Sequence, residues 1–267
     1  MTGSLLNVPS RVGRSRTLSI ARYTLLEARR NRFLWTACGI VAVLVMLSLF
    51  ARQLAITESD RVQAVFLSTA SRAVLVFVVC IYVLQGLFRD FQDKILDLML
   101  SFDMPRWQYV LGKFFGHFLL GAACAAIAAL PLLFLADASR VAAWACSLAM
   151  ELWIVSAAAM FCVTAFSQLL PAASFVLGFY LLARSVAAIQ LMSRSTLAAP
   201  GGETELLSSL ADALALVLPR LDAFTQSAWL VDAPALPASP LALLAQTAVF
   251  VALLLAAAMI DLHRRNL

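Results

Sequence analysis

The sequence predicts an all-α polytopic membrane protein with six transmembrane helices and both termini in the cytoplasm. Three observations lead to this prediction: 63% of the 267 residues are apolar, only 13% are charged, and the mean hydropathy is +0.90. A soluble protein of this size could not cover its surface with so few charges. The same composition excludes a disordered chain and a small disulfide-stabilised secreted module.

Six apolar runs are candidates for crossing a bilayer core, which takes about 20 helical residues. These runs are residues 33–50, 73–88, 114–136, 141–166, 169–192 and 241–260. The second run is short, so the ends of its helix are expected in the flanking residues. None of the runs alternates apolar and polar residues with period two, which excludes a transmembrane β-barrel.

The distribution of Lys and Arg predicts the orientation, because cytoplasmic loops carry an excess of both. Thirteen of the 20 basic residues fall in residues 1–32, in residues 89–113 and after the last run, and six fall on the opposite side. We therefore predict a cytoplasmic N-terminal segment at 1–32 and one transmembrane domain at 33–267. That domain has a cytoplasmic loop at 89–113 and an outer loop at 193–240. The net charge of +5 then reflects topology and gives no indication of nucleic-acid binding.

Residues 17–32 read as a basic amphipathic helix that lies at the cytoplasmic face of the membrane. Its apolar face contains Leu18, Ala21, Leu25 and Ala28, and its arginines, Arg22 and Arg29 among them, point mostly elsewhere. The alternative is a group of arginines that serves only to orient the first span. Both can hold, since the arginines can fix orientation while the apolar face binds lipid.

A second amphipathic helix is predicted inside the cytoplasmic loop. Apolar residues recur at spacings of three and four, at Phe88, Phe91, Ile95, Leu98, Met99 and Phe102. Acidic residues, including Asp93 and Asp97, lie between them, and Met104-Pro105 ends the pattern. A loop with this much pattern is expected to contact a partner, which could be lipid, the helix bundle or another subunit. The alternative is an interfacial helix that serves only as an anchor.

Two charged residues, Glu151 and Arg184, fall within apolar runs. At 1.5 Å per residue they lie about 15 Å and about 12 Å from the predicted outer boundary. Because a charge that faces lipid is expensive, this similar depth predicts an ion pair between the fourth and fifth spans. The alternative is that one of the two lines a path for cargo.

The remaining candidate chemistry is sparse. The five cysteines all lie in apolar runs without a Cys-x-x-Cys pair, and His117 and His263 stand alone. Buried apolar cysteines are therefore expected, and a His-based metal site is not. The sequence also contains no Gly-x-x-x-x-Gly-Lys-Ser/Thr phosphate loop. We expect no catalytic, cofactor-binding or metal-binding residues in this chain.

Three segments carry a wider similarity: IARYTLLEARRNR at 20–32, ILDLMLSFDMPRWQYVLGKFFG at 95–116 and LPRLDAF at 218–224. Together with the six-span layout and the long outer loop, they resemble the membrane subunits of ATP-binding-cassette exporters of the type 2 permease family. The resemblance covers nearly the whole chain. One departure is the absence of a glycine at Asp93-Lys94, where family members often have an acidic residue and a Gly-Thr pair.

The resemblance implies a permease subunit in a bacterial cytoplasmic membrane. A separate ATPase subunit, present in two copies, would bind ATP and magnesium. A second permease chain, normally a homodimer partner, would complete the transporter, surrounded by membrane lipid and without nucleic acid. The loop at 89–113 would couple to the ATPase, through Phe91, Asp93, Ile95, Asp97, Leu98 and Phe102. The outer loop would contain short re-entrant helices; the alternative is a helical cap that does not contact cargo.

Two other functions stay open at the level of sequence. A non-transporting membrane scaffold or assembly factor would have the same pattern of spans. An intramembrane enzyme is a weaker alternative, because it needs catalytic polar groups within or beside the spans, and no Ser/His pair, HExxH or paired aspartates occur there. The sequence does not select a cargo.

Overall fold

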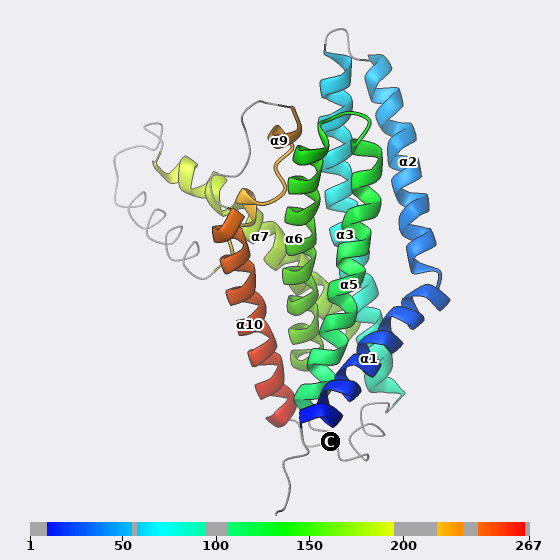
Figure 1. Ribbon diagram of the computed structural model, residues 1–267. Coiled ribbons are helices and arrows are strands. Elements are labelled where there is room, and N and C mark those ends of the chain that lie inside the picture. Colours follow the sequence, from blue (N-terminus) through cyan, green and yellow to red (C-terminus); the bar gives the residue numbers. More distant parts are fainter. Residues whose placement is uncertain (1–9, 55–57, 94–105, 195–217, 232–239, 265–267) are drawn as a thin grey trace, which may run out of the picture.

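The computed structural model describes residues 10–54, 58–93, 106–194, 218–231 and 240–264 (Figure 1). Within these ranges the chain forms eight α-helices and one 3₁₀ helix, and it forms no strand. Six of the described helices are long and apolar enough to cross a membrane. The chain is therefore an all-α polytopic membrane protein.

The six crossing helices match the six apolar runs of the sequence, and each helix is longer than its run, although α5 ends four residues and α6 one residue before the predicted end. They are α2 (Phe33–Leu54), α3 (Ser59–Gln92), α5 (Arg106–Leu132), α6 (Ala138–Ala165), α7 (Leu169–Arg194) and α10 (Pro240–Arg264). The second helix differs most from its run, because α3 begins at Ser59 and has 34 residues. The start of α1 (Ser10–Arg30) and the end of α10 lie at the same end of the bundle, as six crossings require (Figure 1).

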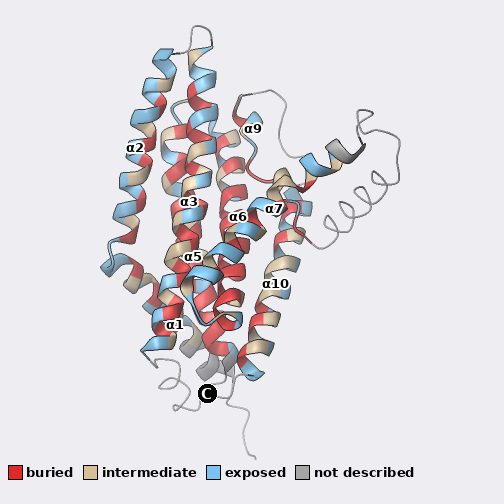
Figure 2. Cartoon of the chain, turned by 180° about the vertical axis from the view of Figure 1, so that it is seen from behind, coloured by how far each residue is buried: buried red, intermediate tan, exposed pale blue. Residues whose placement is uncertain are grey.

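Helix α6 forms the centre of the bundle. It contacts four of the other five crossing helices, α3, α5, α7 and α10, and nearly all residues of its most apolar stretch are buried. Small residues such as Ser156, Ala157 and Ala159 allow this close approach of neighbours. Figure 2 shows buried positions concentrated in α6 and exposed positions along α2. The exposed apolar faces of the outer helices suit contact with lipid.

Helix α1 lies obliquely across the ends of the bundle and packs mainly along α5 (Figure 1). The predicted apolar face is only partly the packed face: Ala21 and Ala28 are buried, but Leu18 is 65% exposed. Ile20 and Thr24 complete the buried face instead. The reason is close packing between helices, which favours small or compact side chains on the contact face.

Two glycines of α5, Gly112 and Gly116, receive the buried face of α1. A Cβ atom at Gly116 would lie 2.5 Å from the Cβ of Thr24, and one at Gly112 would lie 2.8 Å from the Cβ of Ile20. This Gly-x-x-x-Gly spacing places both glycines on one side of α5, where backbone meets α1 directly. The position of α1 thus depends on the absence of side chains at these two residues.

We predict opposite effects for one substitution at two glycines. A Cβ atom at Gly86 of α3 would meet no neighbouring residue within 4 Å, so Gly86→Ala should stabilise the chain by up to about 1 kcal/mol through helix propensity. Gly116→Ala should instead destabilise it by about 1–3 kcal/mol, because the new methyl group meets Thr24. Thermal unfolding of the two purified variants measures the difference. A stabilising effect at Gly116 would contradict the close packing of α1 on α5.

Candidate functional site

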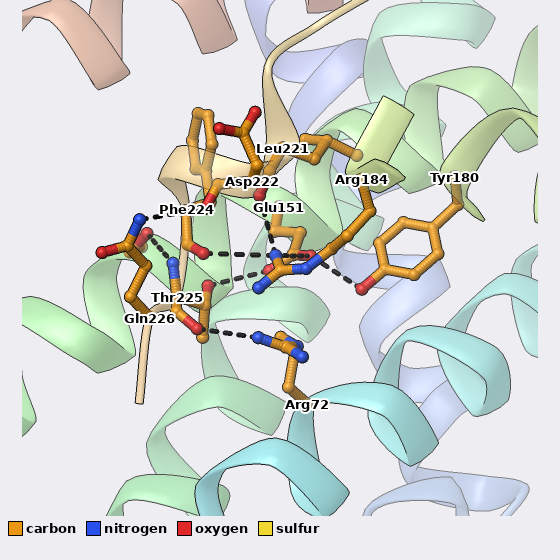
Figure 3. Close-up of polar contacts among 10 residues, drawn as sticks. Arg72, Glu151, Tyr180, Arg184, Leu221, Asp222, Phe224, Thr225 and Gln226 are labelled. Atoms are coloured by element: carbon orange, nitrogen blue, oxygen red, sulfur yellow. Dashed lines mark hydrogen bonds and ion pairs between the residues drawn. The ribbon is translucent and has the colours of Figure 1, made fainter. Parts of the chain in front are cut away.

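The structure places Glu151 of α6 and Arg184 of α7 in an ion pair within the bundle (Figure 3). Nη1 of Arg184 lies 3.2 Å from Oε1 of Glu151, whose side chain is completely buried. Tyr180, one turn before Arg184, donates a hydrogen bond of 2.8 Å from its hydroxyl to the same carboxylate oxygen. Thr225 donates one of 2.8 Å to Oε2. Both oxygens of the buried carboxylate therefore have partners, as its burial requires.

Part of the predicted outer loop folds back onto this pair. The described stretch at 218–231 contains the 3₁₀ helix η1 (Leu221–Ala223) and the one-turn helix α9 (Ala228–Val231). The side chains of Leu221 and Phe224 are completely buried against the bundle. We call residues 218–231 the outer segment.

Backbone carbonyl groups of the outer segment accept hydrogen bonds from two arginines (Figure 3). Nη1 of Arg184 donates to the carbonyl oxygens of Leu221 at 2.7 Å and Phe224 at 3.2 Å. Nη1 of Arg72, from α3, donates to the carbonyl oxygen of Thr225 at 2.9 Å. The carbonyl oxygen of Leu221 also accepts a hydrogen bond of 3.1 Å from the backbone N–H of Phe224 within the 3₁₀ helix. Together with the bond from Thr225 to Glu151, these contacts join α3, α6 and α7 to the outer segment.

Ser147 adds a fourth attachment, because its hydroxyl accepts a hydrogen bond of 2.9 Å from the backbone N–H of Thr225. Thr225 has a positive φ of 46°, which is unusual for a β-branched residue. Its backbone N–H, carbonyl and hydroxyl are each bonded to a different residue of the bundle. The surroundings therefore hold Thr225 in a conformation that it would rarely adopt alone. We call Arg72, Glu151, Tyr180, Arg184, Ser147 and Thr225 the outer cluster.

Sequence reasoning identifies Glu151 and Arg184 but misses the other members of the outer cluster. Tyr180 carries a usable signal, since residues four apart share one face of a helix. Arg72 reads as a residue of the outer loop because the apolar run begins after it, at Ala73. Thr225 carries no signal at all, because its role depends on a loop folding back over a long separation in sequence.

A second buried cluster joins α1, α3 and α5 at the end of the bundle where α1 lies. Nζ of Lys113 lies 2.6 Å from Oδ2 of Asp90 and 3.6 Å from Oε2 of Glu27. Arg89 also forms an ion pair with Glu27, and the hydroxyl of Tyr109 donates a hydrogen bond of 2.9 Å to Asp90. Lys113 and Asp90 each expose only 3% of their side chains. We call these five residues the inner cluster.

The inner cluster involves positions that the sequence analysis places in the loop at 89–113. Asp90 is still within α3, and Lys113 is already the eighth residue of α5, so both belong to the packed helices. Their burial follows from neither charge nor hydropathy, because charged residues next to a span normally contact water. The opposite charges of Asp90 and Lys113 are evident in the sequence, but their contact depends on the angle between two helices.

The residues predicted for coupling are only partly within the described ranges. Phe91, in the last turn of α3, packs against the hydrophobic core, and Asp93 is exposed directly after that helix. Ile95, Asp97, Leu98 and Phe102 lie outside the described residues. On the interface helix, Arg22 and Arg29 are exposed and Leu25 is half-buried.

His117 lies one turn after Lys113 in α5, and its ring is buried. Its two ring nitrogens have no hydrogen-bond partner among the described residues. The ring stands edge-on to Tyr82, with 6.5 Å between centroids. In the described ranges no three His, Cys, Asp or Glu residues are grouped as metal ligands would be. The two charge clusters are therefore the polar sites on which a functional interpretation rests.

The sequence matches no protein-family model, and it matches no curated protein. The resemblance to type 2 exporters accordingly stays a prediction. The class that the fold defines is a six-span, all-α membrane protein.

Proposed function

We propose that this chain is the membrane subunit of an ATP-driven exporter, with ATP hydrolysis supplied by a separate subunit. The observation that carries the proposal is the inner cluster. It ties the interface helix α1 to α3 and α5, the two helices that flank the cytoplasmic connection at 94–105. A force applied to that connection would reach three helices together.

The outer cluster, at the opposite end of the helix bundle, also supports the proposal of a transporter. An exporter has to open and close a path toward the outside, and the outer segment is held by the buried side chains of Leu221 and Phe224 and by a small number of polar contacts. Polar contacts in a low-dielectric setting are strong when complete and costly when broken. They therefore suit a segment that occupies one of two discrete positions.

A transporter built this way needs an energy source outside the chain, since the sequence has no phosphate loop. In this proposal two ATPase subunits bind ATP and magnesium and dock against the connection at 94–105 and its flanks. A second permease chain completes the path, and the assembly lies in a bacterial cytoplasmic membrane. The excess of Lys and Arg at the end of the bundle that contains the inner cluster favours a cytoplasmic position for that end, where the ATPase would dock.

The test is the subunit composition of the complex purified through a tag on the full chain. We expect an ATPase subunit at one copy per permease chain. We expect Leu98→Ala combined with Phe102→Ala to reduce that ratio at least tenfold, because apolar and aromatic anchors dominate such contacts. Phe91 is left intact, because it packs in the core of this chain and its removal would disturb folding.

Phe77→Ala is the matched control, since Phe77 is exposed on the membrane-spanning part of α3. It should leave both the ATPase ratio and ATP hydrolysis unchanged. An unchanged ratio in the Leu98/Phe102 variant would refute coupling through this connection. Purification of the native chain without any ATPase would refute the exporter and favour the scaffold.

A further inference from the structure

A groove of about 540 Å³ lies between α1 and the inner end of α3. It is lined by Tyr23, Leu26, Glu27, Arg30, Asn31 and Arg89. Tyr23, Leu26, Arg30 and Arg89 are all exposed, so the groove is open to the surface. It combines apolar, aromatic and basic groups in one place.

The charge of this groove is positive. Its single carboxylate, on Glu27, is already shared between Arg89 and Lys113. Arg30 forms no ion pair with any residue in the described parts of the chain. The positive charge of Arg30 is therefore available to an anion in the groove. Arg89 can also contact the anion, because its guanidinium has more N–H donors than its contact with Glu27 uses.

The position of the groove indicates that the anion is a lipid headgroup. Leu18, Tyr23 and Leu26 are 65%, 53% and 49% exposed along α1, although water would disfavour such large apolar surfaces. Arg30 precedes the first span by only three residues, since α2 begins at Phe33. Apolar residues and arginines at this level are typical of a helix lying at the headgroup boundary. The groove thus faces lipid headgroups and the first carbons of their chains.

We propose that this groove binds the phosphate-bearing headgroup of an anionic phospholipid of the cytoplasmic leaflet. Arg30 and Arg89 contact the phosphate, Asn31 adds a hydrogen-bond donor, and Tyr23 and Leu26 contact the start of the acyl chains. A zwitterionic headgroup carries a cationic ammonium group that would lie near two arginines, so phosphatidylglycerol is preferred over phosphatidylcholine. This site does not depend on the proposed transport function.

The test is lipid retention by the purified full chain, measured by native mass spectrometry. The probes are phosphatidylglycerol and phosphatidylcholine with the same acyl chains. We expect one phosphatidylglycerol to bind tightly and Arg30→Gln to weaken that binding about fivefold, the effect of one basic residue near an anionic surface. Arg264→Gln is the matched control, because Arg264 is an exposed arginine at the inner end of α10. It should change the binding by less than about twofold, because it lies outside the groove.

Three results would overturn the proposal. One is equal binding of the two lipids to the native chain. Another is an equal loss of phosphatidylglycerol binding in the Arg30→Gln and Arg264→Gln variants. The third is displacement of the lipid by glycerol phosphate at the same concentration, which would identify a free anion as the ligand. If Arg30→Gln does not purify folded, Leu26→Glu tests the same groove by adding a negative charge. Unchanged binding of phosphatidylglycerol to that variant would also overturn it.

Discussion

Glu151→Ala is expected to lower the free energy of unfolding by about 3–5 kcal/mol, the usual effect of breaking a buried ion pair from one side. The substitution leaves Arg184 without its only acidic partner among the described residues. It also removes the acceptors of the Tyr180 and Thr225 hydroxyl groups. Unfolding of the purified chain by increasing denaturing detergent, followed by loss of helix signal, measures the change.

The exposed pair between Glu58 and Arg61 provides the control. Its atoms are 3.3 Å apart, almost the separation of the buried pair, but the side chains of Glu58 and Arg61 are 66% and 47% exposed. Glu58→Ala should therefore change stability by less than about 1 kcal/mol. Adding Arg184→Gln to Glu151→Ala should recover part of the loss, because it removes the unpaired charge. Losses that simply add would show that the two side chains are not coupled.

Asp90→Ala is expected to have an effect of similar size at the other end of the bundle. It leaves the buried ammonium of Lys113 with Glu27 alone, at 3.6 Å, and it removes the acceptor of the Tyr109 hydroxyl. We expect a loss of about 3–5 kcal/mol. The ion pairs of Glu27 with Arg89 and Lys113 do not involve Asp90, so α1 should stay as protected from protease as in the native chain. The same detergent titration, with limited proteolysis, tests both expectations.

Asp60→Ala is the control for this second prediction. Asp60 forms an ion pair of 2.9 Å with Arg52, but the two side chains are 70% and 46% exposed. That substitution should cost less than about 1 kcal/mol. Adding Lys113→Met to Asp90→Ala should restore stability in part, since a buried apolar side chain then replaces an unpaired charge. Equal losses at Asp60 and Asp90 would mean that the inner cluster does not hold α1, α3 and α5 together.

The number of spans was predictable because a bilayer core demands about 20 apolar residues per helix, and that demand is local in sequence. The start of α3 was not predictable, since the stretch from Ser59 to Arg72 is too polar to read as part of a span. Once that stretch is helical and packed, Arg72 lies inside the bundle instead of in a loop. Local hydropathy cannot register such a change, which depends on neighbouring helices.

The ion pairs show the same contrast between what is local in sequence and what depends on neighbouring helices. Glu151 and Arg184 could be matched because each stands alone in an apolar run, and the short turn between α6 and α7 makes these helices antiparallel neighbours. Asp90 and Lys113 stand among other charges, so nothing in the sequence separates them from residues in contact with water. The face of α1 was predicted from hydrophobicity, whereas the structure selects it by how closely Thr24 can approach Gly116.

Helix α3 contributes to both clusters, with Asp90 in one and Arg72 in the other. Eighteen residues separate them, or about 27 Å along the axis at 1.5 Å per residue. No proline interrupts this length, so one common cause of a kink is absent. A straight helix transmits a tilt at one end as a displacement at the other. A tilt of about 10° about the inner end of α3 would move Arg72 sideways by about 5 Å over that length. Such a displacement exceeds the reach of a hydrogen bond and would release the carbonyl group of Thr225.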